Sequence, residues 1–216
     1  MMSDDKNLQQ AVLDQLNWEP SVNAADIGVT AKSGVVTLMG HVESYPEKAA
    51  AERAARRVKC VKAVAEELEV RLPFSFKRGD EEIAAAAISR LKGNWSVPTD
   101  AIKVKVEMGW VTLTGEVEWH YQQEAAADDI RNLRGVTGIS NEVSIKPRAN
   151  ARDIKDSIMM ALHRSWFDPK TITVEVDGGK VNLTGTVHNW NEREVAASTA
   201  WAAPGATIVS NHITIN

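Results

Sequence analysis

The chain contains acids, histidines and a cysteine, the residue types that often act in catalysis or bind metals. Their spacing in the sequence does not match that of a known kind of active or metal site. Adjacent acids such as Asp128 and Asp129 cannot converge as a general acid and base, because neighbouring side chains do not face each other. The histidines also lie far from one another, outside the short spacing that metal ligands require. We therefore predict no catalytic residue, no metal site and no cofactor. The histidines are His41, His120, His163, His188 and His212.

Two further motifs have simpler interpretations than chemistry. "DGGK" at 177–180 lacks the spacing of a phosphate loop and precedes an alternating run, so we interpret it as a hairpin turn. Cys60 is the single cysteine, so no internal disulfide can form. We favour a small tolerated residue at this position over a redox sensor.

Composition excludes several function classes. The 216 residues are 44% hydrophobic and 25% charged, typical of folded domains. The net charge of -4 gives no electrostatic reason to expect nucleic-acid binding. No run approaches the roughly 20 apolar residues of a transmembrane helix. The first ten residues, "MMSDDKNLQQ", do not resemble a secretory signal, so the sequence as written favours a cytoplasmic location. A periplasmic location would follow if a leader had been removed.

One unit is written three times along the chain. "GVVTLMGHV" at 34–42 returns as "GWVTLTGEV" at 109–117 and "GKVNLTGTV" at 179–187, each after an alternating run that predicts a strand. Each repeat therefore contains a β-hairpin, with its turn at the first glycine. The second glycine predicts a close approach, which we expect to be a helix lying across that face. These glycines are Gly34, Gly109 and Gly179 at the turns, and Gly40, Gly115 and Gly185 inside the strands.

Helices are predicted on both sides of each hairpin. The segments 7–18, 80–95 and 151–166 have helical spacing and each ends on a tryptophan, Trp18, Trp95 or Trp166. We expect these rings to wedge the helix end onto the sheet rather than to bind a ligand. Alanine-rich helices follow the hairpins, and each leads through Cys60, Gly135 or Gly205, at the position of a left-handed cap, to a last strand. The unit is α-β-β-α-β.

The pattern resembles the BON domain family. The resemblance rests on the hairpin glycine, "V-x-L-x-G-x-V", the alanine-rich helix, and the closing "S-N-x-V-x-I" with Ser140-Asn141 and Ser210-Asn211. Repeat 1 departs from it, with Cys60 for the glycine and Ala65-Glu66 for Ser-Asn. The resemblance implies an α+β fold of three tandem BON domains, each a small three-stranded sheet with two helices packed on one face. The predicted domains are 3–72, 78–147 and 149–216.

The resemblance also implies binding rather than catalysis. Proteins of this family are associated with the bacterial envelope, anionic phospholipid surfaces, osmotic stress and, in one branch, potassium. We predict a non-enzymatic protein that recognises anionic phospholipid or an envelope or protein partner in osmotic or other stress. The alternatives are a chaperone-like or scaffolding protein and a potassium sensor. A homo-oligomer is compatible with the sequence.

Candidate binding residues are those that the repeats do not share. The second helix of repeat 1 is basic, whereas that of repeat 2 is rich in acids. The basic helix could meet an anionic surface; a solvated face, or docking against repeat 2, is the simpler interpretation. The linker joins aromatic and basic residues, which suits either a membrane anchor or packing between domains. The candidates are Lys48, Arg53, Arg56, Arg57 and Lys59 on the helix, Phe74 and Phe76 in the linker, and Trp119 and Trp190.

Overall fold

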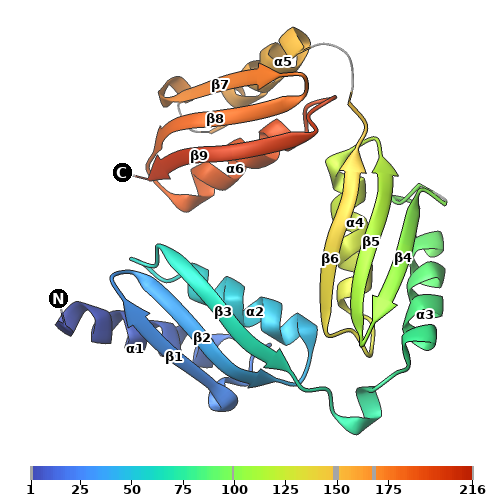
Figure 1. The fold of residues 1–216 in the computed structure, drawn as a ribbon. Helices are drawn as coiled ribbons and strands as arrows, with labels where there is room; N and C mark the ends of the chain where they lie inside the picture. The colour runs from blue at the N-terminus through green and yellow to red at the C-terminus, as the bar shows by residue number, and fades with distance from the viewer. Residues whose placement is uncertain (1, 99, 148–150, 167–168, 216) are drawn as a thin grey trace. The chain divides into compact units, whose positions relative to one another are not determined.

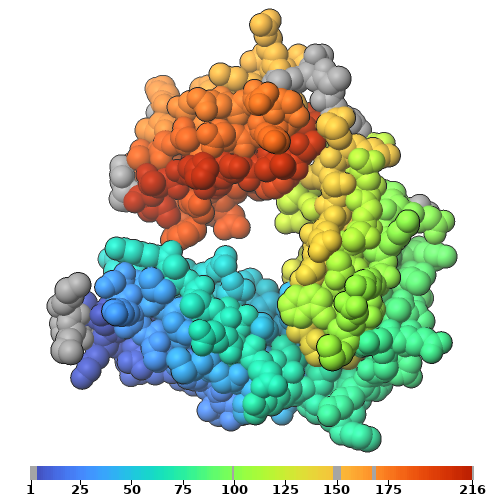
Figure 2. Space-filling model, in the orientation of Figure 1, coloured from blue at the N-terminus to red at the C-terminus, as the bar shows by residue number. Residues whose placement is uncertain are grey.

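Three domains of the same design follow one another along the chain (Figures 1 and 2). The computed structural model describes residues 2–98, 100–147, 151–166 and 169–215. Each domain is a three-stranded sheet with two helices on one face (Figure 1). The predicted α+β fold of three α-β-β-α-β units is confirmed. The ends predicted for the third unit, residues 149 and 216, lie outside the described residues.

The elements recur in the same order in each domain. The first contains α1 (Met2–Trp18), β1 (Ile27–Lys32), β2 (Val35–Val42), α2 (Tyr45–Arg56) and β3 (Ala63–Val70). The second contains α3 (Asp80–Gly93), β4 (Ile102–Glu107), β5 (Trp110–Val117), α4 (His120–Arg131) and β6 (Gly138–Ile145). The third contains α5 (Ala151–His163), β7 (Ile172–Asp177), β8 (Lys180–Val187), α6 (Trp190–Trp201) and β9 (Ile208–Ile215). Short 3-10 turns are η1 (Ala24–Asp26), η2 (Phe74–Phe76) and η3 (Pro169–Thr171).

Each sheet combines an antiparallel and a parallel pair of strands. In the first domain β1 and β2 pair antiparallel, with Ile27 opposite Gly40, and β2 and β3 pair parallel, with Val35 opposite Ala63. The third domain repeats both pairings, with Ile172 opposite Gly185. A parallel pair needs a crossover connection, which is why an alanine-rich helix separates the last two strands of every domain.

One face of each sheet carries the core. Val36 and Leu38 of β2 are fully buried, as are Val12 and Leu16 of α1. On α2 the buried residues are alanines, whose small side chains let the helix lie close to the sheet. The third domain has an equivalent core, formed by Ile154, Ile158 and Leu162 of α5, Val181 and Leu183 of β8, and Ala196 and Ala200 of α6.

Left-handed residues mark the turns of each unit. The hairpin turn Ser33–Gly34 has φ angles of 52° and 86°, and Met108–Gly109 and Gly178–Gly179 match it. Two positive φ values in succession are typical of the type I′ turn. Gly135 and Gly205 have φ of 92° after the second helix, and Cys60 keeps this geometry at 72°. We expect the side chain of Cys60 to cost about 1 kcal/mol there.

The glycine inside the second strand makes room for backbone rather than for a helix. A Cβ on Gly40, Gly115 or Gly185 would lie 2.1, 2.1 or 1.9 Å from a carbonyl oxygen of the residue just before the first strand. All three also have positive φ. The expectation that a helix requires these glycines is therefore wrong: the segment entering the hairpin requires them.

Replacing Gly115 by alanine should destabilise the second domain by about 3 kcal/mol, because left-handed strain and overlap with the Ala101 carbonyl oxygen add. Gly93→Ala is the matched control, since nothing lies within 4 Å of its added Cβ. Hydrogen exchange at the buried Leu113 amide measures both variants. Equal opening free energies for the two would contradict this assignment.

Candidate binding surfaces

A tryptophan near the end of the first helix of each domain is exposed. Trp18 is 81% exposed, Trp95 92% and Trp166 65%. The prediction that these rings wedge the helix onto the sheet is therefore wrong. Trp95 and Trp166 each lie four residues after a buried leucine of their helix, and Trp18 lies two residues after one. Those leucines, Leu16, Leu91 and Leu162, hold the helix ends in place.

The basic end of α2 contacts Glu19, the residue after Trp18, in the first domain. Arg57, just past α2, donates a hydrogen bond of 2.7 Å to Glu19, the residue after Trp18. A hydrogen bond from the Ser21 hydroxyl and the pairing with Arg57 lower the pKa of Glu19 below its ordinary value of 4.5. The contact brings Glu19, which directly follows the exposed Trp18 in the sequence, to the basic end of α2.

The predicted basic residues are engaged to different extents. Arg56 pairs with Glu52 along the helix, and Arg57 pairs with Glu19. Arg53 and Lys59 are exposed, and no ion pair is found for either among the described residues. Lys48 differs from the others because it is only 22% exposed and points to the sheet.

Lys48 blocks the open edge of the first sheet. Its Nζ donates to the carbonyl of Leu68 at 2.7 Å and lies 3.0 Å from Glu66. Glu66 in turn accepts from the Leu68 N–H at 2.6 Å. Strand β3 pairs only with β2, so these backbone groups of Leu68 lie on the edge that another strand would otherwise use. We call this arrangement the edge clamp.

The other two domains build the edge clamp from different side chains. In the second, Gln123 donates to the Val143 carbonyl at 2.6 Å, and Asn141 accepts from the Val143 N–H at 3.4 Å. In the third, Arg193 donates to the carbonyl of Ile213 at 2.9 Å, and Asn211 accepts from the N–H of Ile213 at 3.1 Å.

The clamp explains the asparagine of the "S-N-x-V-x-I" motif. Sequence reasoning missed it, although both positions of repeat 1 differ from those of the other repeats: Lys48 with Glu66, against Gln123 with Asn141 and Arg193 with Asn211.

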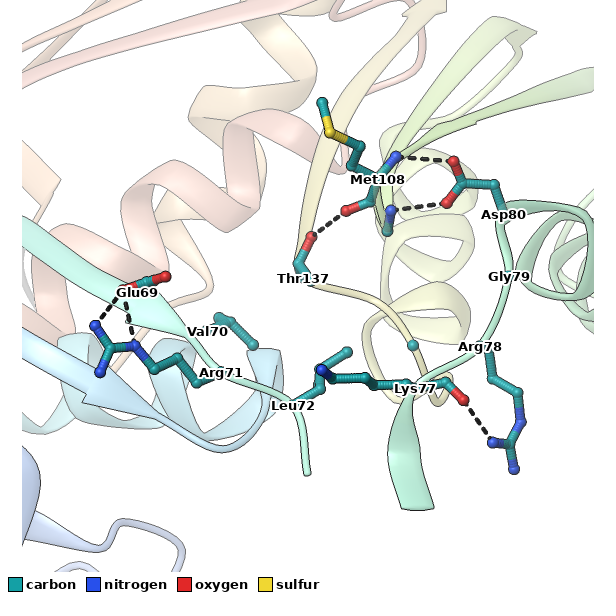
Figure 3. Close-up of a pocket in the computed structure, with 12 residues that line it drawn as sticks. Glu69, Val70, Arg71, Leu72, Lys77, Arg78, Gly79, Asp80, Met108 and Thr137 are labelled. Atoms are coloured by element: carbon teal, nitrogen blue, oxygen red, sulfur yellow. Dashed lines mark hydrogen bonds and ion pairs between the residues drawn. The ribbon is translucent and has the colours of Figure 1, made fainter. Parts of the chain in front are cut away.

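The linker presents the aromatic and basic residues that the sequence singled out. Phe74 is 91% exposed and Phe76 41%, and the guanidinium of Arg134 lies 5.1 Å from the Phe76 ring centre. Arg78 donates to the carbonyl of Lys77 along the wall of a pocket (Figure 3). No ion pair is found for Lys77 within the described ranges. Phe74 and Lys77 are thus the linker side chains open to a ligand.

An acid at the start of α3 fixes the hairpin turn beside this pocket. The two carboxylate oxygens of Asp80 accept from the N–H groups of Met108 and Gly109 at 2.8 and 2.9 Å (Figure 3). Asp5 makes the corresponding bond to Ser33 in the first domain. These acids are therefore structural.

The tryptophans predicted to meet a partner have different surroundings. Trp190 is 54% exposed, with the guanidinium of Arg193 5.1 Å from its ring centre, whereas Trp119 is half-buried. Trp110 is 46% exposed and donates to the Ser140 hydroxyl at 3.0 Å. Trp119 and Trp190 therefore do not present equivalent surfaces.

The part of the chain that the structure describes contains no cluster of three metal-ligating side chains. Within it, none of the helices combines the length and apolar character needed to cross a bilayer.

Comparison with known proteins identifies the family. The sequence profile of the BON domain matches residues 4–71, 79–147 and 150–216. The chain belongs to the BON domain family. All three BON domains contain the edge clamp, and the exposed tryptophan accompanies each of them.

Similar proteins include a curated bacterial relative and two solved structures. Osmotically-inducible protein Y of Escherichia coli K12 is 29% identical over 147 residues, which cover 66% of this chain and 73% of that protein. Two structures of CdsD, a structural protein of the type III secretion system of Chlamydia trachomatis, are 18% identical. The alignments cover 97% of this chain and 92% or 98% of CdsD, with a TM-score of 0.28 in both, too low to support any conclusion.

Transplanting the clamp of BON domain 2 into BON domain 1 tests whether Lys48 is structural. Lys48→Gln and Glu66→Asn should each cost about 1 kcal/mol, because each breaks the largely buried ion pair between Lys48 and Glu66 and leaves the remaining charge without its partner. The double variant should recover most of that loss, since it recreates the pairing of Gln123 with Asn141. Hydrogen exchange at the buried Leu38 amide reports the stability of this domain. Simply additive losses would show that the two residues act independently.

Proposed function

We propose that this chain is a non-enzymatic binding protein that attaches peripherally to anionic phospholipid surfaces. The observation that carries the proposal is the exposed tryptophan at the first-helix end of each BON domain. A large ring held in water is not explained by packing, and tryptophan favours the interface between water and lipid. Three such rings on one chain would bind a membrane with more avidity than one.

Basic residues support an anionic surface as the ligand. In BON domain 1 Arg57, at the basic end of α2, contacts Glu19, the residue that follows Trp18 in the sequence. Arg53 and Lys59 are exposed nearby in sequence, and each basic residue close to an anionic surface contributes about 1 kcal/mol. Lys48 is not part of this surface in our proposal, because the edge clamp uses its ammonium group.

The linker adds a second attachment point of the same chemistry. Phe74 is almost fully exposed, and Lys77 follows it three residues later. An apolar ring beside a cation is the composition of an interfacial anchor. The similarity to osmotically-inducible protein Y supports a role under osmotic or related stress.

Flotation with vesicles tests the proposal. The full chain should float with phosphatidylcholine vesicles that contain phosphatidylglycerol and much less with phosphatidylcholine alone. Combining Trp18→Ala, Trp95→Ala and Trp166→Ala should weaken binding at least tenfold, because the rings supply the apolar contact. Arg53→Glu with Lys59→Glu should weaken it at least about 30-fold, because two basic residues at about 1 kcal/mol each are lost and two acids that the surface repels are added.

Trp190→Ala is the matched control, since it removes an exposed tryptophan that does not recur in the other domains. It should keep most of the binding. Unchanged melting curves would show that the exposed rings can be removed without unfolding the domains. Equal flotation with neutral and anionic vesicles, or no loss in the triple variant, would overturn the proposal.

A further inference from the structure

The outward face of α3 differs from that of the other first helices. Ile83, Ala87 and Leu91 form the buried side. On the opposite side Ile88 is 47% exposed and Ala85 is exposed, so an apolar strip faces solvent in the middle of the helix. At the helical spacing of three to four residues, the strip is Glu81, Ala85, Ile88 and Lys92. We call these four residues the α3 strip.

Charge is separated along the α3 strip. Asp80, Glu81 and Glu82 occupy the first turn of α3, and Arg90 and Lys92 the last. Lys92 lies 4.0 Å from Asp100, but both side chains are well exposed, so this pair is a weak competitor for another partner. The strip therefore has an acidic end, an apolar centre and a basic end.

The corresponding faces of the other domains lack this order. Aligned on the buried leucines, the four positions read Lys6, Gln10, Leu13 and Asn17 in the first domain. In the third they read Arg152, Asp156, Met159 and His163. Neither set has an acid at one end with a lysine or arginine at the other, and both have a polar residue where α3 has Ala85. The α3 strip is thus specific to the second domain.

We propose that the α3 strip is a self-association surface, through which two copies of the chain form an antiparallel helix pair. A two-fold axis at the centre of the strip would place Glu81 against Lys92 of the second copy and Ala85 against its Ile88. Each isoleucine then fills the space left by an alanine, and each acid meets a base. Antiparallel helix dipoles favour the same arrangement. A parallel pair would instead bring like charges together.

The size of the strip predicts a weak dimer. Glu81 and Lys92 are eleven residues apart, about 16 Å along the helix. One helix pair of this length buries less than the roughly 1,200–2,000 Å² of stable interfaces, so we expect association only at high protein concentration. The inference does not depend on lipid binding, and flotation and self-association can fail separately.

Sedimentation velocity of the full chain tests the surface. The dimer fraction should rise between about 10 μM and 1 mM. Ala85→Arg should abolish it, because a long charged side chain cannot pack against Ile88 of the second copy. Asp156→Arg changes the corresponding position of α5 and is the matched control, which should associate like the unaltered chain. A monomer throughout this range, or equal effects of both variants, would overturn the proposal.

A charge exchange tests the antiparallel register. Glu81→Lys and Lys92→Glu chains should each self-associate at least fivefold more weakly, because like charges then face each other at both ends. An equimolar mixture of the two should associate as well as the unaltered chain, since every facing pair in the mixed dimer is again opposite in sign. If the mixture associates no better than its components, the register is wrong.

Discussion

The open edge of the last strand is the constraint on which this architecture depends. A three-stranded sheet exposes backbone hydrogen-bonding groups along its edges, and three such sheets on one chain are held at high effective concentration. Edge-to-edge pairing would join domains that must fold separately. On the edge formed by the last strand, the edge clamp opposes such pairing by occupying the N–H and carbonyl of one central residue in each domain, Leu68, Val143 or Ile213.

This constraint also determines which side chains remain for binding. One position of each second helix is committed to the clamp, which removes Lys48 from any partner surface despite its charge. Trp18, Trp95 and Trp166 remain largely exposed, and one lies near the first-helix end of every domain. In the binding that we propose, these exposed rings contact the lipid surface and Lys48 does not.

The sequence predicted the fold well because its determinants are local. Alternating strands, the hairpin glycines and the alanine-rich helices are each read within about ten residues. Gly40 was assigned to a helix contact because sequence shows that something must approach, but not what. Trp18 was expected to wedge the helix end onto the sheet, because hydrophobicity alone cannot tell a packed ring from an exposed one. The clamp was missed because its partners, such as Arg193 and Asn211, are 18 residues apart.

Fluorescence quenching by brominated phospholipid tests most directly whether the first-helix tryptophans contact lipid. Vesicles of brominated, phosphatidylglycerol-containing lipid should quench part of the emission of the chain's seven tryptophans. Replacing Trp18, Trp95 and Trp166 by phenylalanine keeps an apolar ring at each position, so the variant should still bind while its remaining emission is no longer quenched. Equal fractional quenching of the bound variant and the unaltered chain would contradict the account.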